Sequence, residues 1–155
     1  LAILAGAPDG VTTAALAAAF TGAVTPWDPA PDGQPLTMAA RDGRIFVGGT
    51  FLSVGGQLRP GVAALDAVTG LATSWNPSCN SSVSAIAFAE TTAYLGGTFS
   101  AIGSEPRTAL GEVTLSTGSP TPWNPRPNDK VTALLVDGDI VRHKHGAFST
   151  GKTSS

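Results

Sequence analysis

The sequence predicts an all-β chain, a β-propeller-type array of four-stranded antiparallel blades with a 48-residue period, incomplete at about three blades. Three observations predict it. Aromatic and glycine landmarks recur at one fixed step, short aliphatic stretches alternate with polar residues inside each step, and turn residues separate these stretches. Glycine (19) and proline (12) are abundant among the 155 residues, which indicates many turns.

The repeat is exact in its landmarks. Trp27, Trp75 and Trp123 are separated by 75 − 27 = 48 and 123 − 75 = 48 residues, and the glycine pairs that start at Gly48 and Gly96 keep the same step. A period of this length indicates a solenoid, a propeller or a similar array.

Four short strands are expected in each period, joined by turn-forming residues. Four antiparallel strands in about 45 residues are typical of a propeller blade. The expected first strands are Pro35–Ala40, Val83–Phe88 and Val131–Val136; the second are Arg44–Gly48 and Thr92–Gly96; the third are Gly61–Asp66 and Ala109–Thr114; the fourth are Leu71–Trp75 and Ser119–Trp123. Residues 11–20 align with the third strands, so a strand is expected there too.

The period divides the chain into four parts. Residues 1–34 form a partial blade that contains Trp27, residues 35–82 and 83–130 form one blade each, and residues 131–155 form a partial, degenerate blade and tail. A propeller ring needs about four blades to close. We therefore expect further blades from a longer parent chain, or self-association, to cover the open edges.

The landmarks of one period resemble the kelch repeat, and more closely the repeats of exported bacterial β-propellers. The resemblance rests on the second period, in which the matching residues are Phe46 to Phe51, Gly55, Gly56, Arg59, Leu65, Asp66, Thr69, Gly70, Trp75, Asn76 and Pro77. It implies a β-propeller module of an extracellular or cell-surface bacterial protein.

Structural roles account for these landmarks. The glycine pairs permit close backbone approach where blades crowd, and each tryptophan offers a flat surface for packing between neighbouring blades. Arg59 and Arg107 are expected to hold loop carbonyl groups or to pair with Asp66 or Glu112.

The repeat breaks near its end, where Arg142–His145 replaces Val47-Gly48 and adds two residues. We match Ile140-Val141 with Ile45-Phe46, and Gly146–Phe148 with Gly49–Phe51. His143 and His145 alternate, so in a strand they would lie on one face and could begin a metal site. A frayed chain end is the favoured interpretation.

Other chemical signals are weak. Residues 146–153 match the phosphate-loop pattern G-x-x-x-x-G-K-[ST] in form, but too few residues follow for the helix that such a loop needs, so we interpret the match as coincidence. Turn aspartates could bind calcium loosely, without the spacing of an EF-hand: Asp28, Asp32, Asp137 and Asp139. No catalytic, cofactor-binding or metal-binding residue is assigned.

The single cysteine, Cys79, excludes an intrachain disulfide. In an exported protein it would be a bystander or a link to another chain. The net charge of −2 gives no general attraction to nucleic acid, and no apolar run is long enough for a membrane span.

We expect a non-catalytic module that presents loops to a protein or glycan partner, without a cofactor. The alternative is a fragment of an enzymatic propeller, either a quinone-dependent dehydrogenase or a copper oxidase; the only tyrosine, Tyr94, lies on an expected core strand. An intracellular kelch-type adaptor is a third possibility, which charged loops would favour; these loops are mostly Gly, Ser, Thr and Pro.

Overall fold

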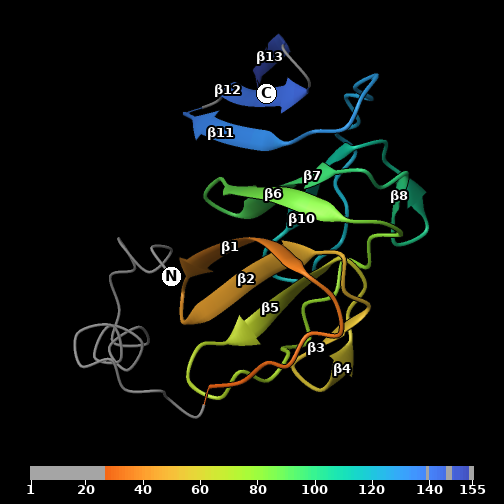
Figure 1. The fold of residues 1–155 in the computed structure, drawn as a ribbon. Coiled ribbons are helices and arrows are strands. Elements are labelled where there is room, and N and C mark those ends of the chain that lie inside the picture. The colour runs from red at the N-terminus through yellow and green to blue at the C-terminus, as the bar shows by residue number, and fades with distance from the viewer. Residues whose placement is uncertain (1–26, 139, 146–147, 154–155) are drawn as a thin grey trace.

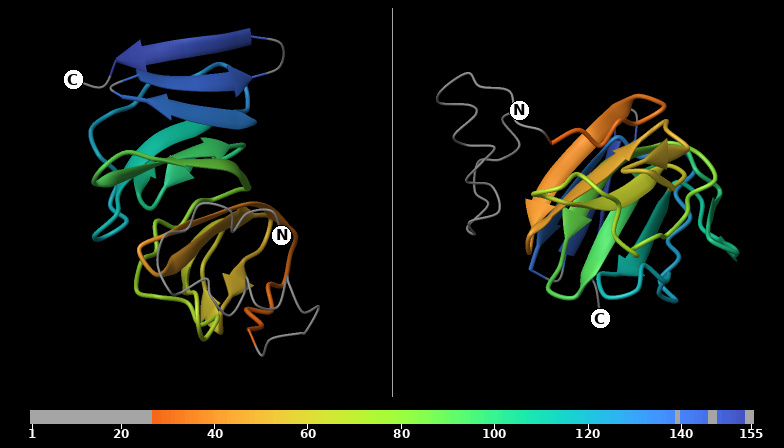
Figure 2. Two further views of the ribbon diagram at one scale, coloured as in Figure 1. Left: turned by 90° about the vertical axis from the view of Figure 1, so that its left-hand side faces the viewer. Right: turned by 90° about the horizontal axis from the view of Figure 1, so that it is seen from below.

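The computed structural model describes residues 27–138, 140–145 and 148–153, and all regular elements in these residues are β-strands. Three antiparallel sheets stack one on another (Figures 1 and 2). The first sheet joins β1 (Pro35–Arg41), β2 (Arg44–Gly49) and β5 (Val62–Asp66); the second joins β6 (Val83–Phe88), β7 (Thr92–Gly97) and β10 (Leu110–Thr114); the third joins β11 (Ala133–Asp137), β12 (Ile140–His145) and β13 (Phe148–Thr153). The chain is an incomplete β-propeller, as predicted. The strand expected over residues 11–20 lies outside the described residues.

The fourth segment of each blade is shorter than expected. Ala72 forms an isolated bridge with Leu65, and Pro120 forms the equivalent bridge with Val113. Each bridge is flanked by two backbone hydrogen bonds; in the first sheet the N–H of Asp66 donates to Leu71 and that of Thr73 donates to Ala64, both at 2.8 Å. Proline does not account for the short pairing, because the first sheet has Ala72 at this position and forms the same single bridge, with the N–H of Ala72 donating to Gly55 at 3.0 Å.

Each of the first two sheets carries a small hairpin between its second and third long strands. In the first sheet it is formed by β3 (Ser53–Val54) and β4 (Gln57–Leu58), and in the second by β8 (Ala101–Ile102) and β9 (Glu105–Pro106). The connections between the second and third strands, for which only turn-forming residues were expected, therefore contain short paired strands.

The third sheet keeps the register of the other two. Ala40 pairs with Ile45, and 96 residues later Val136 pairs with Val141. The matching of Ile140-Val141 with Ile45-Phe46 is therefore wrong by one residue, since Val141 occupies the position of Ile45. Residues 142–145 are not a frayed end: β12 is the central strand and pairs with β11 on one side and β13 on the other.

The position of β13 also differs from the one that the sequence predicted. It pairs directly with β12, from His145 opposite Phe148 to Ile140 opposite Thr153, so it takes the place of β5 and β10. Ser149 follows its partner Lys144 by five residues, whereas Val62 follows Gly48 by fourteen. The segment that forms the small hairpin in the other sheets is missing here. The sequence matched Phe148 with Phe51, and this prediction is wrong, because Phe148 begins the strand that replaces β5.

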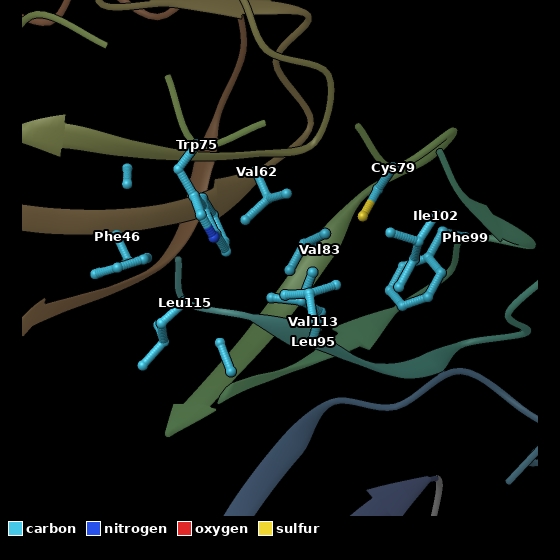
Figure 3. Packing of buried hydrophobic residues seen from close by; sticks show 12 residues of the cluster. Phe46, Val62, Trp75, Cys79, Val83, Leu95, Phe99, Ile102, Val113 and Leu115 are labelled. Atoms are coloured by element: carbon cyan, nitrogen blue, oxygen red, sulfur yellow. The ribbon is translucent and has the colours of Figure 1, made fainter. Parts of the chain in front are cut away.

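The core lies between the sheets. The largest cluster of buried side chains fills the junction between the first and second sheets (Figure 3), and its largest members are Phe46, Trp75, Leu95, Phe99 and Ile102. A second cluster, which includes Val47, Phe51 and Leu65, lies on the other face of the first sheet, and a smaller one lies between the second and third sheets. Burial of this apolar surface is the main source of stability.

The tryptophans join successive repeats, as their spacing predicted. The indole Nε1 of Trp27 donates to the carbonyl of Asp66 at 3.2 Å, and that of Trp75 donates to the carbonyl of Thr114 at 3.0 Å. Both pairs are separated by 39 residues. Trp75 is only 2% exposed and meets the ring of Phe46 edge to face at 5.0 Å. Trp27 and Trp75 therefore each attach their own repeat to the third strand of the next sheet.

Candidate functional site: the two hairpins

The hairpins β3–β4 and β8–β9 lie at the same end of their sheets, on the same side of the stack (Figure 1). Each connects the second strand of its sheet to the third, so equivalent backbone is presented twice, one sheet apart. Loops on a rigid scaffold are where binding residues are found most often. Whether these hairpins are rigid depends on what holds them.

An acceptor side chain holds the first strand of each hairpin. Asp32 Oδ1 accepts hydrogen bonds from the backbone N–H groups of Leu52 (2.8 Å) and Ser53 (3.0 Å). Forty-eight residues later, Asn80 Oδ1 accepts the equivalent bonds from Ser100 (2.9 Å) and Ala101 (3.1 Å). The two N–H donors lower the pKa of the Asp32 carboxyl below its usual value, because they stabilise its charged form.

An arginine holds the second strand of each hairpin. Arg59 donates from one guanidinium nitrogen to the carbonyl of Leu58 (2.7 Å) and from another to that of Thr73 (2.8 Å). Arg107 repeats the arrangement with Pro106 (2.7 Å) and Thr121 (2.6 Å). Arg107 is only 7% exposed.

Of the two roles expected for these arginines, the geometry shows the first: they hold loop carbonyls. Arg107 also approaches Glu105 at 3.9 Å, but no ion pair forms between either arginine and Asp66 or Glu112 among the described residues. Glu112 accepts hydrogen bonds from the hydroxyls of Thr92 (2.9 Å) and Thr121 (2.7 Å) instead.

The linker that follows each tryptophan runs along the next hairpin. The N–H of Gly55 donates to the carbonyl of Pro29 at 2.7 Å, and the N–H of Gly103 donates to that of Ser78 at 2.8 Å. Cys79 also forms a bridge with Ile102 of β8. Each hairpin is therefore held by the linker, which includes the acceptor side chain, and by the arginine.

The outward side chains of the two hairpins differ although their supports repeat. Leu52 and Leu58 are 61% and 68% exposed on the first hairpin. Their equivalents 48 residues later are Ser100 and Pro106, both exposed, and Gln57 is replaced by the exposed Glu105. Leu58 pairs with Ser53, and Leu52 accepts a hydrogen bond from the N–H of Arg59, so the two leucines are not a cross-strand pair. An exposed leucine on a held backbone is suited to contact with a partner.

Two of the four turn aspartates have structural partners. Asp28 Oδ1 accepts a hydrogen bond from the N–H of Ala30, and Asp32 holds the first hairpin. Asp137 ends β11, and Asp139 lies outside the described residues. No cluster of three potential metal ligands occurs in the part of the chain that the structure describes.

The two histidines lie on one strand, as the alternation required. His143 is buried in the middle of β12, opposite Leu134, and His145 ends the strand.

The phosphate-loop match falls on β13, where residues 148–153 pair with β12 throughout. The backbone N–H groups of this segment therefore belong to a strand and do not form a phosphate-binding loop that opens a helix.

Cys79 and Tyr94 are core residues. Cys79 is 1% exposed inside the junction of the first two sheets, and burial raises the pKa of its thiol to about 12. Such a thiol is neither a nucleophile nor a link to another chain at neutral pH. Tyr94 is buried and meets Trp123 edge to face at 5.3 Å.

The acceptors Asp32 and Asn80 were missed as a pair by the sequence analysis. Their spacing of 48 residues, with a short polar acceptor at each position, was the signal that could have found them. The sequence did not indicate that Leu52 and Leu58 are exposed, because a leucine next to a strand can equally well be a core residue.

Comparison with known proteins supports the architecture. Residues 40–67 match the family model described as a domain of unknown function (DUF5122), beta-propeller. The crystal structure of the computationally designed Ika4 protein is similar in fold, with a TM-score of 0.52 and 14% sequence identity over 80% of this chain and 93% of Ika4. The designed Ika8 protein gives a TM-score of 0.46, with 14% identity over 76% of this chain and 45% of Ika8. No curated protein sequence matches the chain.

A search of the described residues finds no helix that is long and apolar enough to cross a membrane.

Proposed function

We propose that this β-propeller chain is a non-catalytic binding module that presents its two hairpins to a protein or glycan partner. One observation carries the proposal: the supports of the hairpins repeat while their exposed side chains change. Asp32 and Asn80 are equivalent, as are Arg59 and Arg107. A rigid backbone with variable surface residues is how binding scaffolds obtain specificity without the entropic cost of ordering a loop on binding.

The polar groups near the hairpins are engaged in structure, which supports a non-catalytic role over an enzymatic one. The carboxylate of Asp32 accepts two backbone N–H groups, and at the opposite end of the first sheet the pKa of Asp66 is lowered by the N–H groups of Thr69 and Val68. A general acid or base needs a pKa near neutrality, and these carboxyls are shifted in the opposite direction.

The module would belong to an exported or cell-surface bacterial protein. The resemblance of its repeats to those of exported bacterial propellers supports this, together with few lysines and loops made of small polar residues. Protease treatment of intact cells of the native host tests it: release or cleavage of the protein without lysis is expected, and protection until lysis would contradict it.

The binding proposal is tested with an array of glycans and of surface proteins from the native host, probed with the intact chain. Any ligand found is then measured against Leu52→Ser with Leu58→Thr. The matched control is Val68→Ser, since Val68 is equally exposed (65%) but follows β5 at the opposite end of the sheet. We expect the hairpin variant to lose binding and the control to retain it. Equal binding by both variants would exclude the first hairpin as the site.

A further inference from the structure

The face that each sheet turns toward the next one changes in character along the chain. The second strand places Phe46 and Gly48 on this face in the first sheet, Tyr94 and Gly96 in the second, and Arg142 and Lys144 in the third. The equivalence follows from the strand register, which holds at steps of 48 residues in all three sheets.

The glycine on this face is the point on which the following sheet rests. A Cβ atom added to Gly48 would lie 2.8 Å from Cγ1 of Val83 and 2.9 Å from its carbonyl oxygen. A Cβ atom added to Gly96 would lie 2.6 Å from Cγ1 of Val131. Real Cβ atoms do not approach other atoms so closely, so the next first strand can pack here only because the side chain is absent.

The aromatic residue on this face receives the tryptophan of its own repeat. Phe46 meets Trp75 at 5.0 Å and Tyr94 meets Trp123 at 5.3 Å, both edge to face. These pairs add apolar surface to each junction, and edge-to-face contacts contribute beyond that area. Arg142 stands at the equivalent position of the third sheet.

The third sheet has neither feature. Arg142 and Lys144 are both exposed. The residues opposite them on β13 are Gly151 and Ser149, where the first sheet has Ala64 and Val62 opposite Phe46 and Gly48. On β11, Leu135 pairs with Arg142 and is 59% exposed, and a single exposed leucine does not form a docking patch.

We propose that the sheet β11–β12–β13 is a capping blade, whose outer face does not accept another blade of this repeat. Lys144 places a long charged side chain where the next strand would have to touch the backbone, and burial of Lys144 and Arg142 at a junction would leave both charges without water. Repeat arrays need terminal units with a polar outer face to remain soluble. This assignment rests on the residues of the face and is independent of the proposed binding role.

Two measurements on the intact chain test the cap. Lys144→Cys is labelled with a thiol reagent over a wide range of protein concentration, with the buried Cys79 as the internal control for intact folding. Sedimentation equilibrium then compares the wild-type chain with Arg142→Glu/Lys144→Glu.

We expect rapid labelling at position 144 at every concentration, no labelling of Cys79, and the same mass for the wild-type and charge-reversed chains. Labelling that slows as concentration rises would show that another copy covers the face. A change of mass on charge reversal would show the same, and either result would overturn the cap.

Discussion

Asp32 and Asn80 occupy equivalent positions in successive repeats, and each accepts two backbone N–H groups from the first strand of a hairpin. One is charged and the other neutral, yet the geometry is the same. The support therefore depends on the acceptor oxygen and not on the charge.

Asp32→Asn should keep the first hairpin folded and remove part of the pH dependence of stability. The pKa of Asp32 is lowered from 3.8 in the folded chain. Its contribution is therefore present above pH 3.8 and is lost as the pH falls through the folded value. Urea unfolding followed from pH 7 to pH 2.5 should show a smaller loss for Asp32→Asn than for the wild type. An equal loss would mean that other carboxyls carry the effect.

Trp75→Ala should be the most destabilising of the tryptophan substitutions. Trp75 is buried between two sheets and donates to Thr114, whereas Trp27 is only half-buried. Removal of a buried tryptophan costs about 3 to 5 kcal/mol, and Trp27→Ala should cost clearly less. Chemical denaturation of both variants measures the difference, and similar costs would contradict the assigned junction.

Gly48→Ala should destabilise the junction by about 1 to 3 kcal/mol, the usual cost of overpacking. The added Cβ meets the backbone and side chain of Val83. Gly111→Ala is the control: the nearest atom to its Cβ, at 2.5 Å, is Cδ1 of Ile102, the end of a flexible side chain. Thermal unfolding should rank Gly48→Ala below Gly111→Ala. The reverse order would show that sheet stacking does not depend on Gly48.

Arg107→Lys should loosen the second hairpin although the charge is kept. The guanidinium reaches the carbonyls of Pro106 and Thr121 together, and a lysine ammonium cannot reproduce this planar fork. A loss of about 1 kcal/mol is expected, because the carbonyls that lose their donor are part-buried. Arg59→Lys should cost less, because Arg59 is only half-buried. Urea unfolding of the two variants provides the comparison.

The 48-residue step was sufficient to predict the stacked sheets, because Trp27 and Trp75 make equivalent contacts, as do Gly48 and Gly96. It was insufficient for β13. Spacing matched Phe148 with Phe51, but pairing with β12 decides the position of this strand, and a short connection removes the hairpin. The fourth strands were also overestimated: alternation predicts a strand at both positions, but Ala72 and Pro120 each form only one bridge, and the N–H of Ala72 donates to Gly55 of the hairpin loop.

Hairpin function was the least predictable part. Leu52 and Ser100 have the same backbone environment and different side chains. The repeat pattern can therefore predict the residues that hold the hairpins, but not the side chains that the hairpins expose. His143 and Arg142 were visible as a break in the repeat, but only the register shows that they replace Leu95 and Tyr94 on opposite faces of one strand.

Hydrogen exchange of individual amides, followed by NMR, tests the central claim that both hairpins are rigidly held. The N–H groups of Leu52 and Ser100 belong to exposed residues and donate to Asp32 and Asn80. We predict that they exchange as slowly as the amides of β2 and β7, and that Asp32→Ala accelerates exchange at Leu52 but leaves Ser100 unchanged. Fast exchange at both positions in the wild-type chain would show that the hairpins are mobile, and would contradict the account.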